Sequence, residues 1–166
     1  MRSRYKFIET EGLYFITATV VQWIPVFTNE KYFKVIMESL CFCQKQNKFN
    51  VHAWVILENH LHLIISGCDL SDGIRDFKSY TAKRLITLIK EDRKAWLLNQ
   101  LSYYRLRYKT QSQYQFWQEG VHPQLIKDEA MWAQKVDYIH QNPVTRGYVL
   151  NPEDWKYSSA RDFIEI

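Results

Sequence analysis

The chain is poor in cysteine and has no long apolar run. These two features argue against a disulfide-rich, a cysteine-zinc or a membrane-spanning protein. It contains three cysteines among 166 residues, an odd number without a Cys-x-x-Cys pair, so neither a disulfide framework nor a cysteine zinc site is expected. No apolar stretch approaches the roughly 20 residues that a membrane-spanning helix requires. Residues 1–6 also lack the apolar segment of a signal peptide. We therefore expect a cytoplasmic protein with reduced cysteines and no contact with a membrane.

The composition is that of a globular domain rich in aromatic side chains. Hydrophobic residues make up 46% of the chain and aromatic residues 16%, enough to form a core and to offer rings on which nucleic-acid bases can stack. The formal net charge of +4 permits a nucleic-acid partner without requiring one. Since no repeat, low-complexity run or linker is visible, we expect one domain over residues 1–166.

Hydrophobic periodicity predicts an alternation of strands and helices. Strands are expected at 12–21, at 50–66 with a turn or bulge at Glu58-Asn59, and at 104–109 and 113–118. Helices are expected after Thr28, from Ser71 or Asp72 to about Lys90, and from Asp128 to about Asn142, before Pro143. The order β-α-β-β-α-β-α predicts an α+β fold with a ferredoxin-like antiparallel sheet and helices on one face.

Two histidines in the 50–66 region are the first candidate for a functional site. Residues two apart in a strand point to the same face, so His60 and His62 project together while Leu61 and Leu63 face the core. Two convergent imidazoles are half of a metal site. The same pattern also occurs without function, and from the residues alone the two interpretations stand about even. A histidine-triad hydrolase would need a third histidine at the position of Ile64.

A tyrosine on the last predicted helix is the second candidate. Tyr138 shares a polar face with Gln134 and Asn142, one turn to either side. A metal at the histidine pair would polarise a phosphodiester, and a tyrosine placed in line with it could act as a nucleophile. Alternatively, Tyr138 covers the seam between helix and sheet, as most helical tyrosines do. A metal combined with a tyrosine is how some proteins cut and rejoin single-stranded DNA.

Around these residues the chain resembles a family. Residues 53–64, with Asn59-His60-Leu61-His62, resemble the HUH block of single-tyrosine transposases. Residues 136–147, with Tyr138-Ile139-His140-Gln141-Asn142-Pro143, resemble the tyrosine block of their REP-associated branch. Segments 116–118 and 154–159 match that branch in type and order, and the resemblance extends from about Gly12 to Arg161.

This resemblance implies a HUH endonuclease fold and a defined chemistry. His60 and His62 would bind a divalent ion, Mg²⁺ or Mn²⁺ in this family, and Asn142 occupies the position of the third ligand. Ligand chemistry alone does not decide the identity of the metal, because imidazoles also bind Zn²⁺ or Ni²⁺. Tyr138 would attack a phosphate of single-stranded DNA near a hairpin, leaving a 5′-phosphotyrosine link and a free 3′-OH. A homodimer is possible, since some members exchange tyrosine helices between subunits.

Basic residues in three segments are candidate DNA contacts, and each has a plainer interpretation. The first lies in the N-terminal segment 1–11, which in this branch can contact DNA beside a hairpin and could equally be a flexible tail. The second lies on the helix that follows Ser71, where the cations could simply be solvated. The third lies in the segment 90–115, which is longer than in compact members and could instead be a solvated insertion. The candidates are Arg2, Arg4, Lys6, Lys78, Lys83, Arg84, Arg105 and Arg107.

Two alternatives stay open beside the transposase. A replication or mobilisation nickase would share the His pair and the tyrosine, but such enzymes usually carry further domains. A non-catalytic nucleic-acid-binding regulator derived from a transposase would need no intact site. All of the proposed catalytic residues are present here, which favours an active enzyme.

Overall fold

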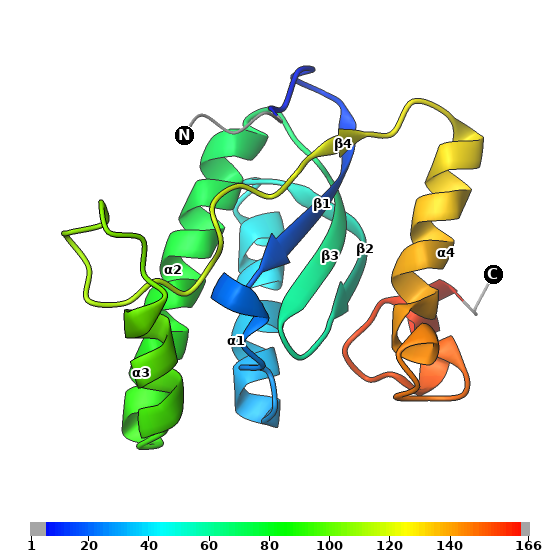
Figure 1. The fold of residues 1–166 in the computed structure, drawn as a ribbon. Helices are drawn as coiled ribbons and strands as arrows, with labels where there is room; N and C mark the ends of the chain where they lie inside the picture. The colour runs from blue at the N-terminus through cyan, green and yellow to red at the C-terminus, as the bar shows by residue number, and fades with distance from the viewer. Residues whose placement is uncertain (1–5, 164–166) are drawn as a thin grey trace.

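The computed structural model describes residues 6–163 and has the α+β architecture that the sequence predicts (Figure 1). The elements are β1 (Leu13–Thr19), η1 (Val21–Trp23), α1 (Glu30–Lys45), β2 (Asn50–Ile56), β3 (His60–Ser66), α2 (Leu70–Glu91), α3 (Ala95–Tyr103), β4 (Gln124–Leu125), α4 (Glu129–Thr145), η2 (Pro152–Asp154) and η3 (Ala160–Phe163). The strands form one antiparallel sheet in the order β2-β3-β1-β4. This is the split βαβ order of a ferredoxin-like sheet, with β3 and β1 at its centre.

The sheet is covered on both faces, whereas we expected helices on one face only. Helices α1 and α2 lie on one side of the sheet and α4 on the other (Figure 1). The larger core lies under α1 and α2, and a smaller core around Phe15, Ile64 and Ile139 lies under α4. The prediction was wrong because β3 carries apolar residues toward both faces, as strands buried on two sides do.

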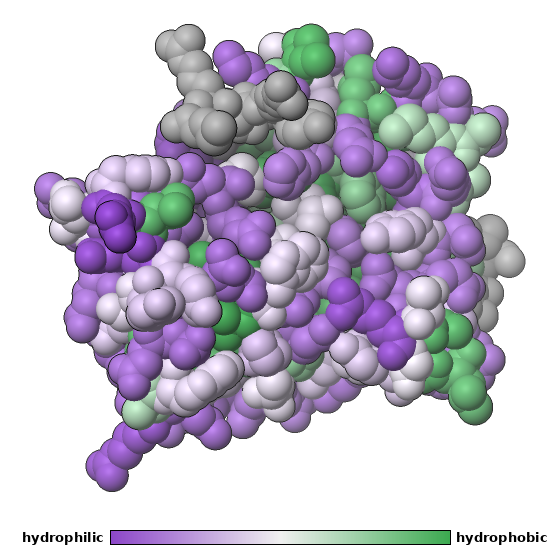
Figure 2. Space-filling view, viewed as in Figure 1, coloured by the Kyte–Doolittle hydropathy of each residue, from purple (hydrophilic) through white to green (hydrophobic). Residues whose placement is uncertain are grey.

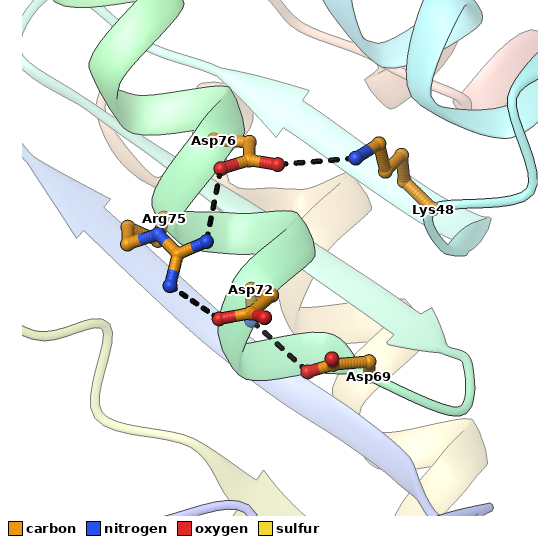
Figure 3. A network of polar contacts seen from close by, with 5 residues as sticks. All are labelled: Lys48, Asp69, Asp72, Arg75 and Asp76. Carbon is orange, nitrogen blue, oxygen red and sulfur yellow. Dashed lines mark hydrogen bonds and ion pairs between the residues drawn. The ribbon is translucent and has the colours of Figure 1, made fainter.

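Asparagine and aspartate side chains begin the long helices. Asn29 rather than Thr28 caps α1, and Asp69 rather than Ser71 or Asp72 caps α2. Figure 3 shows the start of α2, where Asp69 accepts the backbone N–H of Asp72. In the same view Arg75 bridges the carboxylates of Asp72 and Asp76, and Lys48 reaches Asp76 at 3.1 Å. Asp128 caps α4 as predicted, accepting from Met131 N at 2.7 Å.

The C-terminal end of α4 lies beyond the predicted boundary at Asn142. Pro143 is buried inside the last turn, and the helix continues to Thr145. A proline there forfeits one backbone hydrogen bond, and a closing turn follows at Gly147, which has φ +76°. Gly147 N donates to Val144 O, and Tyr148 N donates to Pro143 O. These two bonds satisfy the carbonyls at the end of the helix.

The segment between α2 and α4 differs most from the prediction. Residues 104–109 form turns rather than a strand, and the preceding residues form α3, which the sequence analysis did not predict. Within 113–118, Trp117 makes a single bridge to Val20. The fourth strand of the sheet is instead β4, two residues that pair with Tyr14 and Phe15. The alternation of apolar and basic residues at 104–109 therefore reflects successive turns and not a pleated strand.

The hairpin agrees with the prediction, and the C-terminal segment packs against it. Glu58-Asn59 turns the chain between β2 and β3, and the bulge lies further back, between Val51 and Ala53. The segment after α4 packs along the outer edge of β2: Ile56 N donates to the backbone oxygen of Tyr157, and the Trp155 indole donates to the backbone oxygen of Ile56. This packed loop covers strand edges that would otherwise be unpaired.

The surface carries polar side chains over most of the face drawn in Figure 2, with small and separate apolar areas. Cys43 is buried, whereas Cys41 and Cys68 are exposed. Within residues 6–163, no helix is both long and apolar enough to cross a membrane.

Candidate active site

Strand β3 holds the two histidines on the sheet face that α4 covers. His60 and His62 are 3% and 5% exposed, and their ring centroids lie 4.8 Å apart at an angle of 78°. Across the sheet His62 lies opposite Thr17, and His60 lies opposite Thr19. The alternation of the strand therefore brings both imidazoles together, as predicted.

One nitrogen of each imidazole is already bound by a neighbouring side chain. His60 Nδ1 lies 2.7 Å from Asn59 Oδ1, and His62 Nδ1 lies 2.8 Å from Thr17 Oγ1. Since an amide oxygen only accepts, His60 Nδ1 donates and its Nε2 keeps a lone pair. His62 Nε2 is buried and has no hydrogen-bond partner among residues 6–163. This orphaned nitrogen beside a second free Nε2 fits a bound metal ion, whose histidine ligands are usually oriented through the other nitrogen.

Both imidazoles are neutral near pH 7. Burial, followed by the charge of Arg146, lowers the pKa of His60 to about 4, while Glu58 opposes the change. Burial, followed by the charges of His60, Arg146 and Lys135, lowers the pKa of His62 to about 3. A neutral imidazole is the form that binds a metal. The electrostatics of the pair therefore agree with a ligand role.

Helix α4 places Tyr138 beside His62. The two ring centroids are 5.3 Å apart, and the tyrosine ring also meets the edge of Phe15 at 5.9 Å. Ile139, the next residue, packs into the core under α4, which fixes the rotation of the helix. Tyr138 is 50% exposed, so its ring is held by neighbours while solvent and a ligand can still reach it.

A cavity of about 580 Å³ separates β3 from α4 and brings the four predicted residues together. It is lined by Trp23, His60, His62, Gln134, Asp137, Tyr138, Gln141, Asn142, Thr145 and Arg146. Within the described part of the chain, no group of three His, Cys, Asp or Glu side chains could hold a metal ion. A metal here would therefore bind to the two imidazoles and the Asn142 carboxamide, with solvent or substrate oxygens completing its coordination.

Several residues of this cavity were missed by the sequence analysis. Trp23 meets His60 edge-to-face, with centroids 5.3 Å apart. Arg146 follows the last turn of α4, where it pairs with Glu58 from the β2–β3 turn. No pattern in the sequence marks Trp23, because it lies in an irregular segment, but Arg146 lies two turns beyond Tyr138 and that spacing could have indicated it.

Those candidate DNA contacts that the structure describes lie outside this cavity. Lys6 is exposed, and Arg2 and Arg4 fall outside the described residues. The ammonium of Lys78 donates to the backbone oxygens of Gln118 and Gly120 at 2.7 and 2.8 Å, so it already has partners within the chain. The others lie on α2 or in the turns after α3, and Arg105 bonds the backbone oxygen of Ser112; these are Lys83, Arg84, Arg105 and Arg107. Their contact with DNA stays a prediction.

Two other histidines, His52 and His140, lie away from the cavity. His140 is buried and bonds Ser159 Oγ at 2.9 Å, which ties α4 to the C-terminal segment. His52 bonds Ser66 Oγ at 2.7 Å on the β2–β3 ladder. Neither lines the space between His60 and Tyr138.

Two curated proteins are similar to this chain in sequence. No family model matches the chain. A Haemophilus influenzae protein, provisionally named a REP-associated tyrosine transposase, is 28% identical over 152 residues, which cover 89% of this chain and 79% of the relative. The Escherichia coli K12 REP-associated tyrosine transposase is 25% identical over 129 residues, 76% of this chain. The match spans 64% of the E. coli protein, less than two thirds of its length.

Solved structures share the fold. A REP-associated tyrosine transposase solved bound to a REP hairpin superposes with a TM-score of 0.69 at 20% identity, covering 98% of this chain and 84% of the other. A Deinococcus radiodurans protein provisionally described as a transposase gives a TM-score of 0.52 at 15% identity, covering 84% and 95%.

The fold and the sequence relatives define the class. An antiparallel sheet that carries a His-x-His pair under a helix with a tyrosine is the architecture of HUH tyrosine transposases, and this chain is similar to them over most of its length. Within that class the similarity is to the REP-associated branch, as the motifs around His60 and Tyr138 indicated.

Proposed function

We propose that the chain is a transposase that binds, cleaves and rejoins single-stranded DNA near hairpins through Tyr138. The observation that carries this proposal is the placement of Tyr138 beside His62, with His60 and Asn142 on the same cavity. The sequence relatives support a DNA-processing role of this kind. The E. coli relative is matched over only part of its length, so the activity is proposed here for the residues present.

A divalent ion, Mg²⁺ or Mn²⁺, is the proposed cofactor. His60, His62 and Asn142 would hold it through two Nε2 atoms and a carboxamide oxygen, a mixed set that leaves positions for phosphate oxygens. When bound, such an ion withdraws electron density from a phosphate and makes its phosphorus easier to attack. The chain's own contribution is to keep both imidazoles neutral and correctly turned, through burial and through Asn59 and Thr17.

Tyr138 is the proposed nucleophile. Its hydroxyl oxygen would form a bond to phosphorus while the bond from phosphorus to the 3′-oxygen breaks. The tyrosine proton is released, and the departing 3′-oxygen takes up a proton to become a free hydroxyl. The product is a 5′-phosphotyrosine, and because one phosphodiester replaces another, a new 3′-OH can reverse the step without ATP.

Hairpin-forming single-stranded DNA is the proposed substrate. A structural neighbour was solved bound to a REP hairpin, and the exposed rings after α2 offer stacking surfaces for unpaired bases. Those rings are Trp96, Tyr103, Tyr104 and Tyr108. Because the His pair and Tyr138 belong to one chain, we propose that one copy forms a complete site. The resemblance leaves a homodimer open beside this monomeric site.

The covalent intermediate provides the test. Purified protein is incubated with Mn²⁺ or Mg²⁺ and labelled single strands that carry hairpins from the flanks of its own gene, and SDS-resistant adducts are separated on a gel. We expect an adduct with the wild type that disappears with EDTA and with Tyr138→Phe. Tyr80→Phe is the matched control, because Tyr80 is also an exposed tyrosine on a helix and does not line the cavity.

Two outcomes would contradict the proposal in different ways. An adduct that persists in Tyr138→Phe would show that another residue is the nucleophile. Tight hairpin binding without any adduct in the wild type would favour the non-catalytic regulator instead.

A further inference from the structure

Arg146 lines the cavity and forms an ion pair with Glu58. Its Nη1 pairs with Oε1 of Glu58, and the two side chains are 32% and 24% exposed. The second oxygen of Glu58, Oε2, is buried without a hydrogen-bond partner among the described residues. Since a guanidinium has five N–H donors and the pair engages only part of them, Arg146 retains donors for an anion.

Arg146 lies close to the histidine pair. It lines the same cavity as His60 and His62, so its guanidinium and both imidazoles face one space. A planar guanidinium matches the oxygens of a phosphate, in which it can make two parallel hydrogen bonds. Arg146 is therefore placed to bind a phosphate that enters beside the histidines.

Trp23 also lines this cavity, and its backbone is strained. Gln22 and Trp23 have φ values of +52° and +55°, a left-handed conformation that side chains with a Cβ rarely adopt. Trp23 N donates to Val20 O at 2.9 Å, and Asn59 Nδ2 donates to Trp23 O at 3.1 Å. These bonds hold an indole that is 50% exposed against His60. Strain kept at such a position often serves a site.

We propose that Arg146 and Trp23 together hold one nucleotide of the single strand, Arg146 at its phosphate and Trp23 at its base. This inference rests on the proposed function and adds two binding residues to it. The cavity of about 580 Å³ lies within the range of sites for small ligands. Stacking on an indole tolerates any base, so this nucleotide is held without being read. Glu58 aims the guanidinium and competes with the phosphate for it.

Noncovalent affinity as a function of salt tests the phosphate contact. All variants are made on a Tyr138→Phe background, so that a fluorescent hairpin with a single-stranded flank is bound and not cleaved. For single strands each phosphate contact adds about 0.7 to the slope of log affinity against log salt. Arg146→Gln should lower the slope by that amount and weaken binding about 10-fold at low salt. Glu58→Gln should tighten binding, because it removes a competing carboxylate.

Variants at Trp23 give a different signature. Trp23→Ala should weaken binding by roughly 5- to 150-fold with the slope unchanged, and Trp23→Phe should restore much of the loss. Arg75→Gln is the matched control, since Arg75 is also ion-paired but lies with Asp72 and Asp76 at the start of α2 (Figure 3). We expect the control to leave both affinity and slope unchanged.

The outcomes separate the inference from the function on which it rests. If the Tyr138→Phe parent fails to bind the hairpin, the proposed function is overturned and the inference with it. If the parent binds and Arg146→Gln leaves the slope unchanged, the phosphate contact is overturned alone. A merely structural role would weaken binding in both Arg146→Gln and Glu58→Gln, against the opposite signs expected here. Thermal unfolding of each variant verifies that it is folded.

Discussion

At the scale of single residues, the site depends on the neighbours that turn each imidazole. Asn59 and Thr17 each engage an Nδ1 atom, so both Nε2 atoms are left for a ligand. The sequence marked the two histidines by their spacing, but it contained no sign that Thr17, 45 residues earlier, would reach His62. That contact exists only because β1 and β3 pair in one register.

Thr17→Val should therefore weaken metal binding. Losing an outer hydrogen bond to a histidine ligand typically costs 10- to 100-fold in metal affinity, so about that loss is expected. Thr17→Ser should restore it, because the hydroxyl returns. Mn²⁺ binding measured by electron paramagnetic resonance provides the readout without requiring activity.

Thr19→Val is the control for this substitution. Thr19 lies on the same face of β1 and opposite His60, yet no hydrogen bond joins those two side chains. An equal loss of Mn²⁺ affinity in both variants would show that the strand, and not the Thr17 hydroxyl, is responsible.

The buried imidazoles also predict how stability depends on pH. In the folded protein burial holds the pKa of His60 near 4 and that of His62 near 3, while an unfolded histidine titrates near 6.5. Below pH 6.5 the unfolded chain binds protons first, so the free energy of unfolding falls as the pH drops toward 4. Above pH 6.5 this contribution is constant. Each histidine adds a slope of up to about 1.4 kcal/mol per pH unit.

Urea unfolding of the metal-free protein at several pH values measures this slope. Replacing His60 and His62 by asparagine should flatten it. Some dependence should persist, because burial also lowers the pKa of His52 and His140. A slope that does not change in the double variant would mean that these two histidines do not titrate as described.

At the scale of elements, α4 is the part on which the site depends most. Only Ile139, His140 and Pro143 of this helix are buried, so few contacts attach it to the sheet. The apolar side chains of Trp132, Val136 and Ile139 pack in the core under this helix. Its end was misjudged, because the closing turn at Gly147 outweighs the hydrogen bond lost at Pro143.

Gly147 provides a clean test of this closing turn. A Cβ there would meet no atom within 4 Å, so Gly147→Ala adds only the strain of a left-handed residue, about 1–2 kcal/mol. Gly147→Asn should cost less, because asparagine tolerates this conformation better. Urea unfolding of both variants gives the comparison. Equal stability of the alanine variant and the wild type would contradict the assigned conformation.

At the scale of the whole molecule, the sequence predicted the sheet and four residues that line one cavity, but not how the helices cover the sheet. The strands from 12–21 and 50–66 and the long helices were recognisable because their periodicity is regular. Helix α3 and strand β4 were not, since α3 is short and β4 is a strand only through its pairing with β1. Local sequence contains little information about such pairing.

Four residues of the cavity were identified from sequence motifs, whereas Trp23 and Arg146 were identified only from the structure. His60, His62, Tyr138 and Asn142 lie in two blocks whose spacing is informative on its own. Trp23 reaches the site through a backbone conformation that no propensity favours. Its position could be known only once η1 was folded against the β2–β3 turn.

The polarity and position of the covalent link test the central claim most directly. Identical hairpin strands labelled at the 5′ or the 3′ end are incubated with protein and Mn²⁺, and the adduct is digested for peptide mass spectrometry. The account predicts that the 3′ label stays with the protein, that the 5′ label leaves on a fragment ending in a 3′-OH, and that the nucleotide lies on Tyr138. A link through the 3′ end, or to any residue other than Tyr138, would contradict it.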